Sequence, residues 1–270
     1  MKTKRLYLLA VSVAAMFSLS SCEQMVKKGL QTMMENVVNH NYEDSEKWGK
    51  VITVPLNLGE FKSIDVTGTV RVVYTQDTVC HVTAYGNEKA IEKYDVTVED
   101  GDLTVTLKDF SGKINRNTPA MTVYVSAPTL KKLEVSGAGD VDFENKIVQS
   151  ESLSIKVKGA GDIDIDSLEV KDLDLEISGA GDVDINWMKA EDVSMEISGA
   201  GDLNGTLIAR DIEAEVSGAG DIDLNVDCRK VKADVKGAGD VTLTGKCKIL
   251  QKSSGKASNL DVEGLEIAEE

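Results

Sequence analysis

The feature that most constrains the fold of this chain is a five-residue motif, Ser/Lys-Gly-Ala-Gly-Asp, which occurs six times in its C-terminal half. The steps between successive copies are 22, 20, 20, 19 and 19 residues. Such a nearly fixed period is typical of a solenoid, in which each repeat packs mainly on its two neighbours. The copies end at Asp140, Asp162, Asp182, Asp202, Asp221 and Asp240.

The residues on both sides of the motif alternate between apolar and polar. In one repeat the apolar positions are Leu173, Leu175, Ile177, Val183 and Ile185. Alternation with a period of two predicts strands with one buried face, whereas a helix would need apolar residues at i, i+3 and i+4. Each repeat is therefore expected to form two short strands.

The glycines are expected at the corner between these strands, where they would adopt backbone angles closed to other residues. In-register stacking of the coils predicts an all-β fold, a parallel β-helix with coils of about 19–22 residues. The helix is expected to be right-handed, because parallel crossover connections almost always are. A degenerate copy of the motif at Asn259 indicates the terminal coil.

These patterns divide the chain into five segments. The strand-like runs before the repeats are less regular, and we expect them to cap the solenoid, because its end would otherwise expose unpaired strand edges. The segments are a signal peptide (1–22), a tether (23–50), an irregular β region with the first coils (51–130), the regular β-helix (131–263) and an acidic tail (264–270).

The first 22 residues have the order of a bacterial lipoprotein signal. A basic start with Lys2, Lys4 and Arg5 precedes an apolar run, and small residues lead to Cys22. This resembles a lipobox, and the order favours a lipid anchor on Cys22 over an ordinary secretory signal. We therefore expect an envelope protein anchored to a membrane by its lipid, the outer membrane being favoured, with the face left open.

The net charge of −16 argues against nucleic acid as a partner, because no stripe of Lys and Arg is present. Aromatic residues make up only 4% of the chain, so Val, Ile and Leu must supply the core. Two cysteines, Cys228 and Cys247, each lie seven residues after a motif aspartate. They should meet on adjacent strands about 4.8 Å apart, where either a disulfide or a buried pair of thiols would fit.

The six motif aspartates should form a column along the solenoid. Neighbouring carboxylates about 4.8 Å apart would repel by roughly 0.9 kcal/mol even in water. One interpretation is that bound cations, calcium above all, offset this repulsion. The favoured alternative is that each carboxylate accepts hydrogen bonds from backbone N–H groups at the glycine corner.

Enzymatic chemistry has little support in the sequence. The two histidines, His40 and His81, lie outside the repeats, and the motif serines have no histidine in phase with them. No catalytic residue and no cofactor other than possible calcium is expected. Polysaccharide-active enzymes of similar shape exist, so this alternative stays open, but a fold alone does not define a reaction.

The repeated motif, together with Ile64-Asp65-Val66-Thr67-Gly68 and Ala127-Pro128-Thr129-Leu130, resembles the bacterial family called putative auto-transporter adhesin, head GIN domain. The resemblance covers roughly residues 55 to 260. It implies a β-helical domain similar in shape to pectin lyases, without recognised catalytic residues, for which cell adhesion has been suggested.

We therefore expect a non-enzymatic adhesion or binding lipoprotein whose repetitive surface engages a glycan or a cell-surface protein through many weak contacts. The alternatives are a polysaccharide-active enzyme and a structural spacer of the envelope.

Overall fold

The computed structural model describes residues 48–108, 121–255 and 258–268. Cys22, the predicted signal peptide and almost all of the predicted tether lie outside these residues. Within the described part of the chain, no helix combines the length and the apolar character that crossing a bilayer would require.

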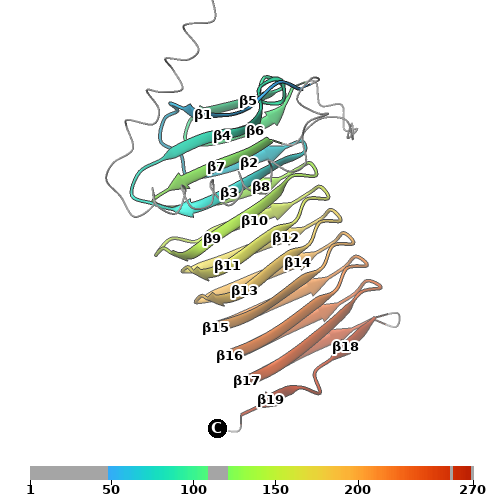
Figure 1. Ribbon diagram of the computed structural model, residues 1–270. Coiled ribbons are helices and arrows are strands. Elements are labelled where there is room, and N and C mark those ends of the chain that lie inside the picture. Colours follow the sequence, from blue (N-terminus) through green and yellow to red (C-terminus); the bar gives the residue numbers. More distant parts are fainter. Residues whose placement is uncertain (1–47, 109–120, 256–257, 269–270) are drawn as a thin grey trace, which may run out of the picture. The chain divides into compact units, whose positions relative to one another are not determined.

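The regular half is a parallel β-solenoid, as predicted (Figure 1). The strands on one side of a coil pair with the same side of the next coil in register, for example Leu173 with Val193 and Ile177 with Ile197. The strands are β8 (Lys132–Val135), β9 (Asp140–Val148), β10 (Leu153–Val157), β11 (Ile163–Glu169), β12 (Asp172–Ile177), β13 (Val183–Lys189), β14 (Asp192–Ile197), β15 (Leu203–Val216), β16 (Ile222–Val235) and β17 (Asp240–Ser254).

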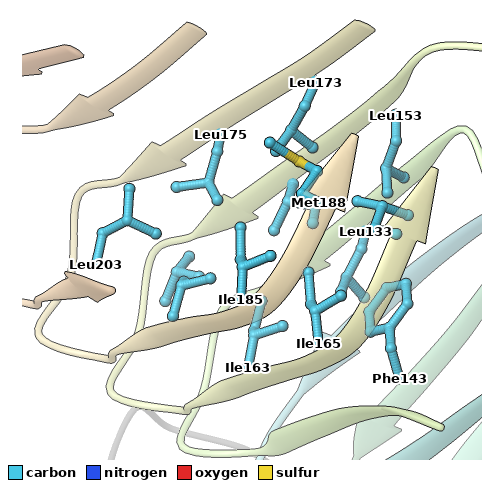
Figure 2. Close-up of a cluster of buried hydrophobic side chains, with 14 of the residues drawn as sticks. Leu133, Phe143, Leu153, Ile163, Ile165, Leu173, Leu175, Ile185, Met188 and Leu203 are labelled. Carbon is cyan, nitrogen blue, oxygen red and sulfur yellow. The ribbon is translucent and has the colours of Figure 1, made fainter. Parts of the chain in front are cut away.

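The inward positions of every coil build one continuous apolar core. Figure 2 shows side chains from successive coils stacked on one another, among them Leu153 on Leu173 and Ile165 on Ile185. All four are buried, with at most 2% of their surface exposed. Burial of one such side chain contributes about 1.5–3 kcal/mol, so a mostly aliphatic stack stabilises the regular coils, with Phe143 on β9 as a buried aromatic residue at their first end.

The motif glycines do lie at the corner between strands, but the reason expected from the sequence is wrong. None of the twelve glycines has a φ in the left-handed region. They are needed because successive coils approach too closely for a side chain. A Cβ on Gly159 would lie 1.8 Å from the carbonyl oxygen of Gly137, and one on Gly199 would lie 1.9 Å from that of Gly179. The same oxygens accept hydrogen bonds from the motif alanines, as from Ala160 to Gly137 at 2.8 Å.

The first coils are stacked in a different order from the sequence. Strand β2 (Ser63–Thr67) pairs in parallel with β6 (Asp102–Leu107) on one side and with β8 on the other. Strand β3 (Val70–Gln76) lies in the same way between β7 (Met121–Ala127) and β9. The coil made by β2 and β3 is therefore inserted between two coils that follow it in the chain.

Antiparallel strands cover the outer edge of these coils, which confirms the predicted irregular cap. Strand β4 (His81–Asn87) pairs with β7, and β1 (Val51–Leu56) pairs with β4. Strand β5 (Tyr94–Glu99) forms an antiparallel hairpin with β6. The short helix α4 (Glu88–Ile91) connects β4 to β5.

At the opposite end, β18 (Asn259–Asp261) and β19 (Leu265–Ile267) pair only with the first half of β17. Asn259 pairs with Asp240, as the degenerate motif predicted. In the second half of β17, Lys252 takes the inward register position next to buried Ala233. Lys252 itself is exposed, and a charge at the register position of a buried residue opposes the addition of a further strand.

We predict that Gly199→Val destabilises the solenoid by about 3 kcal/mol or more, because its side chain would overlap a backbone that is fixed by two neighbouring coils. Urea unfolding followed by circular dichroism measures the loss. The control is Gly59→Val, since a Cβ there has only Val98 nearby, at 3.9 Å. Equal stability of the two variants would contradict the close contact at the corner.

Candidate functional site

The six motif aspartates form a hydrogen-bonded ladder along one corner of the solenoid. In each step, the side chain of one aspartate accepts a hydrogen bond from the backbone N–H of the aspartate in the next coil. The distance is 2.8 Å from Asp202 N to Asp182 Oδ1 and 2.7 Å from Asp240 N to Asp221 Oδ1. The other steps, from Asp162 N to Asp140, Asp182 N to Asp162, Asp221 N to Asp202 and Asn259 N to Asp240, span 2.9–3.3 Å.

Each motif carboxylate accepts its hydrogen bond at the point in the coil where the backbone hydrogen bonds between neighbouring coils change direction. Before this point, the alanine N–H of a later coil donates to a glycine carbonyl of the preceding coil, as Ala180 does to Gly159. After it, the N–H of the preceding coil donates forward, as Ile163 does to the carbonyl of Asp182. The aspartate N–H between them receives its acceptor from the side chain of the preceding coil.

The hydrogen bonds are strong enough to hold the column together. A hydrogen bond to a charged group contributes about 1.5–3 kcal/mol, whereas the repulsion between neighbouring carboxylates is roughly 0.9 kcal/mol in water. Salt screens part of this repulsion. The favoured interpretation from the sequence, a carboxylate that accepts from the backbone at the glycine corner, is therefore confirmed.

A cation and a neutral residue lie at the two ends of this column. The position before Asp140 is taken by Arg71, which pairs with it in register. The Arg71 guanidinium binds both carboxylate oxygens of Asp142, at 2.6 and 2.7 Å. The position after Asp240 is taken by Asn259. The role of Arg71 was not predicted, because β3 is far from the repeats in the sequence.

A second outward column lies two residues further along each coil, and it begins with Asp142, Asp164 and Asp184. Partial burial raises the pKa of the Asp164 carboxyl, and the charges of Asp142 and Asp184 add to this effect. This carboxylate therefore opposes folding increasingly as the pH rises through its pKa. The run of acids ends at Asn204, whose amide donates to Asp184 at 3.0 Å.

Calcium binding by the first column stays a prediction. One oxygen of each carboxylate is occupied by the ladder described above. Among the described residues, no three or more His, Cys, Asp or Glu side chains are grouped so that they could hold a metal ion. Calcium titration of the chelator-treated protein, followed by its melting temperature, tests this expectation.

The two cysteines predicted to meet do so. Cys228 and Cys247 are register partners on β16 and β17, both are buried, and both are free thiols in the structure. Burial raises the pKa of the Cys228 thiol to about 12, and the neighbouring Cys247 adds to this. Burial also raises the pKa of the Cys247 thiol. At neutral pH both thiols are therefore protonated, and they react slowly with disulfides.

Ion pairs between coils lie on the outer face of the strands that precede the motif, such as β10, β12 and β14. Lys156 Nζ lies 2.6 Å from Glu176, and Lys236 Nζ lies 2.6 Å from Glu215. An open depression of about 560 Å³ crosses the start of the strands on this face. Its polar lining includes Ser152, Asp172, Asp192, Asp211 and Lys230.

The described residues give no support to nucleophilic catalysis in the repeats. His81, the one histidine among them, is exposed on β4 in the cap. The hydroxyl of the motif serine Ser136 donates to Glu134 at 3.4 Å, and this carboxylate is already paired with Lys132 and Lys158.

A family model described as putative auto-transporter adhesin, head GIN domain, matches residues 60–247 and 189–269. A crystal structure of a putative adhesin from Bacteroides fragilis is 30% identical, with a TM-score of 0.72 over 78% of this chain and 96% of that chain.

Two structures from Parabacteroides distasonis share the fold at lower identity. A putative adhesin is 20% identical, with a TM-score of 0.66 over 79% of this chain and 97% of its own. A putative lipid binding protein is 16% identical, with a TM-score of 0.63 over 82% and 98%. No curated protein matches the chain.

We predict that Asp182→Ala lowers the free energy of unfolding by about 1 kcal/mol, because the Asp202 N–H loses its acceptor. Asp182→Asn should cost much less, since the amide oxygen can still accept and one repulsive charge is removed. Urea unfolding of the two variants at pH 7 distinguishes them. Equal losses would show that the charge, rather than the hydrogen bond, makes this position important.

Proposed function

Because this chain belongs to the family described as putative auto-transporter adhesin, head GIN domain, we propose that it is a non-enzymatic binding protein of the cell envelope. It is held on the outer membrane by a lipid on Cys22, and its solenoid engages a repetitive ligand on a partner surface, such as a glycan or a cell-surface protein. Membership of an adhesin family supports the association with the cell surface or envelope.

The observation that carries this proposal is the exact repetition of polar groups along the solenoid. Hydrogen bonds between coils place the six motif aspartates in one column, and in-register pairing places Asp142, Asp164 and Asp184 in a second. The strand spacing of about 4.8 Å fixes the interval between them. A rigid row of equivalent groups can bind a repetitive ligand through many weak contacts, whose combined strength exceeds that of any single contact.

The same geometry favours binding over catalysis. Catalysis needs one place where a base, a nucleophile or an acid is set apart from its neighbours. In the column of motif aspartates each carboxylate accepts the same backbone hydrogen bond as the one before it, and the depression lined by Ser152, Asp172 and Asp192 is open. A polysaccharide-active enzyme and a self-assembling spacer are therefore less well supported, the latter because a charged residue, Lys252, lies on the last long strand at the register position of a buried one.

The binding role is tested with the full-length protein on beads, incubated with arrays of glycans and with intact host and bacterial cells. Beads that carry many copies of the protein should bind the ligand about 100-fold more tightly than the free protein does, because many weak contacts then act together. New reducing ends in the bound polysaccharide would instead indicate an enzyme. Absence of retention on both arrays and cells would contradict the proposal.

For the anchor, we predict that Cys22→Ala moves the protein from the membrane fraction to the soluble fraction, because the acyl chains have no other attachment site. Fractionation followed by immunoblotting measures the distribution, with Cys80→Ala as the matched control. Membrane retention of the Cys22 variant would contradict lipid anchoring.

A further inference from the structure

One aromatic side chain breaks the uniform exterior of the regular coils. Trp187 is the only aromatic residue between residues 144 and 270. Its strand neighbours Ile185 and Met188 point into the core and are at most 1% exposed, whereas Trp187 is only partly buried. The core is aliphatic throughout these coils, so the indole is not there to fill it.

Trp187 lies where the coils become narrower. On β9, β11 and β13, two inward-facing residues are separated by a short outward segment, and the length of this segment changes from coil to coil. It has three residues on β9 (144–146), two on β11 (166–167) and two on β13 (186–187). The corresponding interval has a single residue on β15, Thr206, and this short form continues in β16 and β17. Irregular strand segments of this kind re-aim side chains, and here Trp187 stands on the last wide coil, at the step to the narrow ones.

An ammonium group from another strand lies over the indole of Trp187. Lys146 Nζ, from β9, lies 5.6 Å from the centre of the Trp187 ring. The same ammonium group lies 2.8 Å from Oε2 of Glu169, and Lys189 Nζ lies 3.7 Å from its other oxygen. Lys146 and Lys189 thus share the Glu169 carboxylate, on a chain whose net charge is −16.

A second depression, of about 430 Å³, adjoins this group and shares Glu169 and Lys189 with it. Its lining also includes Gln149, Lys171 and Glu191, so two lysines and two glutamates line it in all. Binding sites for small ligands have volumes of about 300–1,000 Å³, so the depression has room for a short segment of a carbohydrate chain.

We propose that Trp187, Lys146 and Lys189 bind a hexuronic acid unit of an acidic glycan. The C–H face of a pyranose ring is weakly positive and apolar, and it stacks on the negative face of an indole. The two ammonium groups pair with the carboxylate of the sugar, and Glu169 accepts from its hydroxyl groups. Because acidic residues outnumber basic residues on the chain, these lysines beside an aromatic ring give an anionic sugar a preferred place to bind.

This inference rests on the proposed binding function and names a ligand class and a subsite for it. The test is isothermal titration of the full-length protein in detergent with tetragalacturonate and, in parallel, with neutral maltotetraose. The acidic sugar should bind at least about tenfold more tightly, and its affinity should fall as salt is added, because ion pairs at the surface are screened.

Variants locate the subsite. Trp187→Ala should weaken binding of tetragalacturonate about tenfold or more, whereas Trp187→Phe should keep it within about threefold, because it retains an aromatic face. Lys146→Ala combined with Lys189→Ala should weaken binding and reduce the salt dependence. The control is Lys246→Ala. Lys246 occupies the register position of Lys189 on a later strand, β17, and pairs with Asp227 at 3.2 Å.

The outcomes separate the two proposals. If the wild type binds cells or arrays but not tetragalacturonate, or if Trp187→Ala binds it normally, the subsite is wrong and the adhesion function stands. If the wild type binds none of these targets, the proposed function fails and the subsite fails with it.

Discussion

The solenoid depends on the approach of one glycine backbone to the next at every coil. From Gly159 to Gly239, a Cβ on any motif glycine would lie 1.8–2.1 Å from the carbonyl oxygen of the corresponding glycine in the preceding coil. No side chain can be accommodated at that distance. Because the corner brings the coils together, the flanking strands can pair in register and their apolar side chains can stack.

The aspartate column follows from the same corner. Where the backbone ladder reverses direction, one N–H in each coil needs an acceptor, and the aspartate of the preceding coil supplies it. The resulting row of charges is a consequence of a structural requirement repeated six times. It also makes one edge of the molecule strongly acidic, and the chain limits this with Arg71 at one end and neutral Asn204 and Asn259 further along.

The sequence predicted those parts of the fold that depend on local repetition. The buried faces of β12 and β13, the corner at the motif, the last coil at Asn259 and the meeting of Cys228 with Cys247 all follow from the period of the repeat. The period contains no information about the irregular half. That β2 and β3 lie between later coils, and that Arg71 therefore reaches Asp142, depends on long-range pairing between strands without a shared motif. The reason for the glycines was missed because a close backbone approach and an unusual φ favour the same residue.

A uniform repeat and a specific site place opposite demands on a solenoid. Identical coils give many equal contacts, so a ligand bound only to the columns could slide from one coil to the next with little change in energy. A defined position requires a coil that differs from its neighbours. The step between the wide coil of β13 and the narrow coil of β15 is such a place, and there Trp187 lies under Lys146, which shares the Glu169 carboxylate with Lys189. Repetition can thus supply avidity while one irregular coil fixes the position and the chemistry of the ligand.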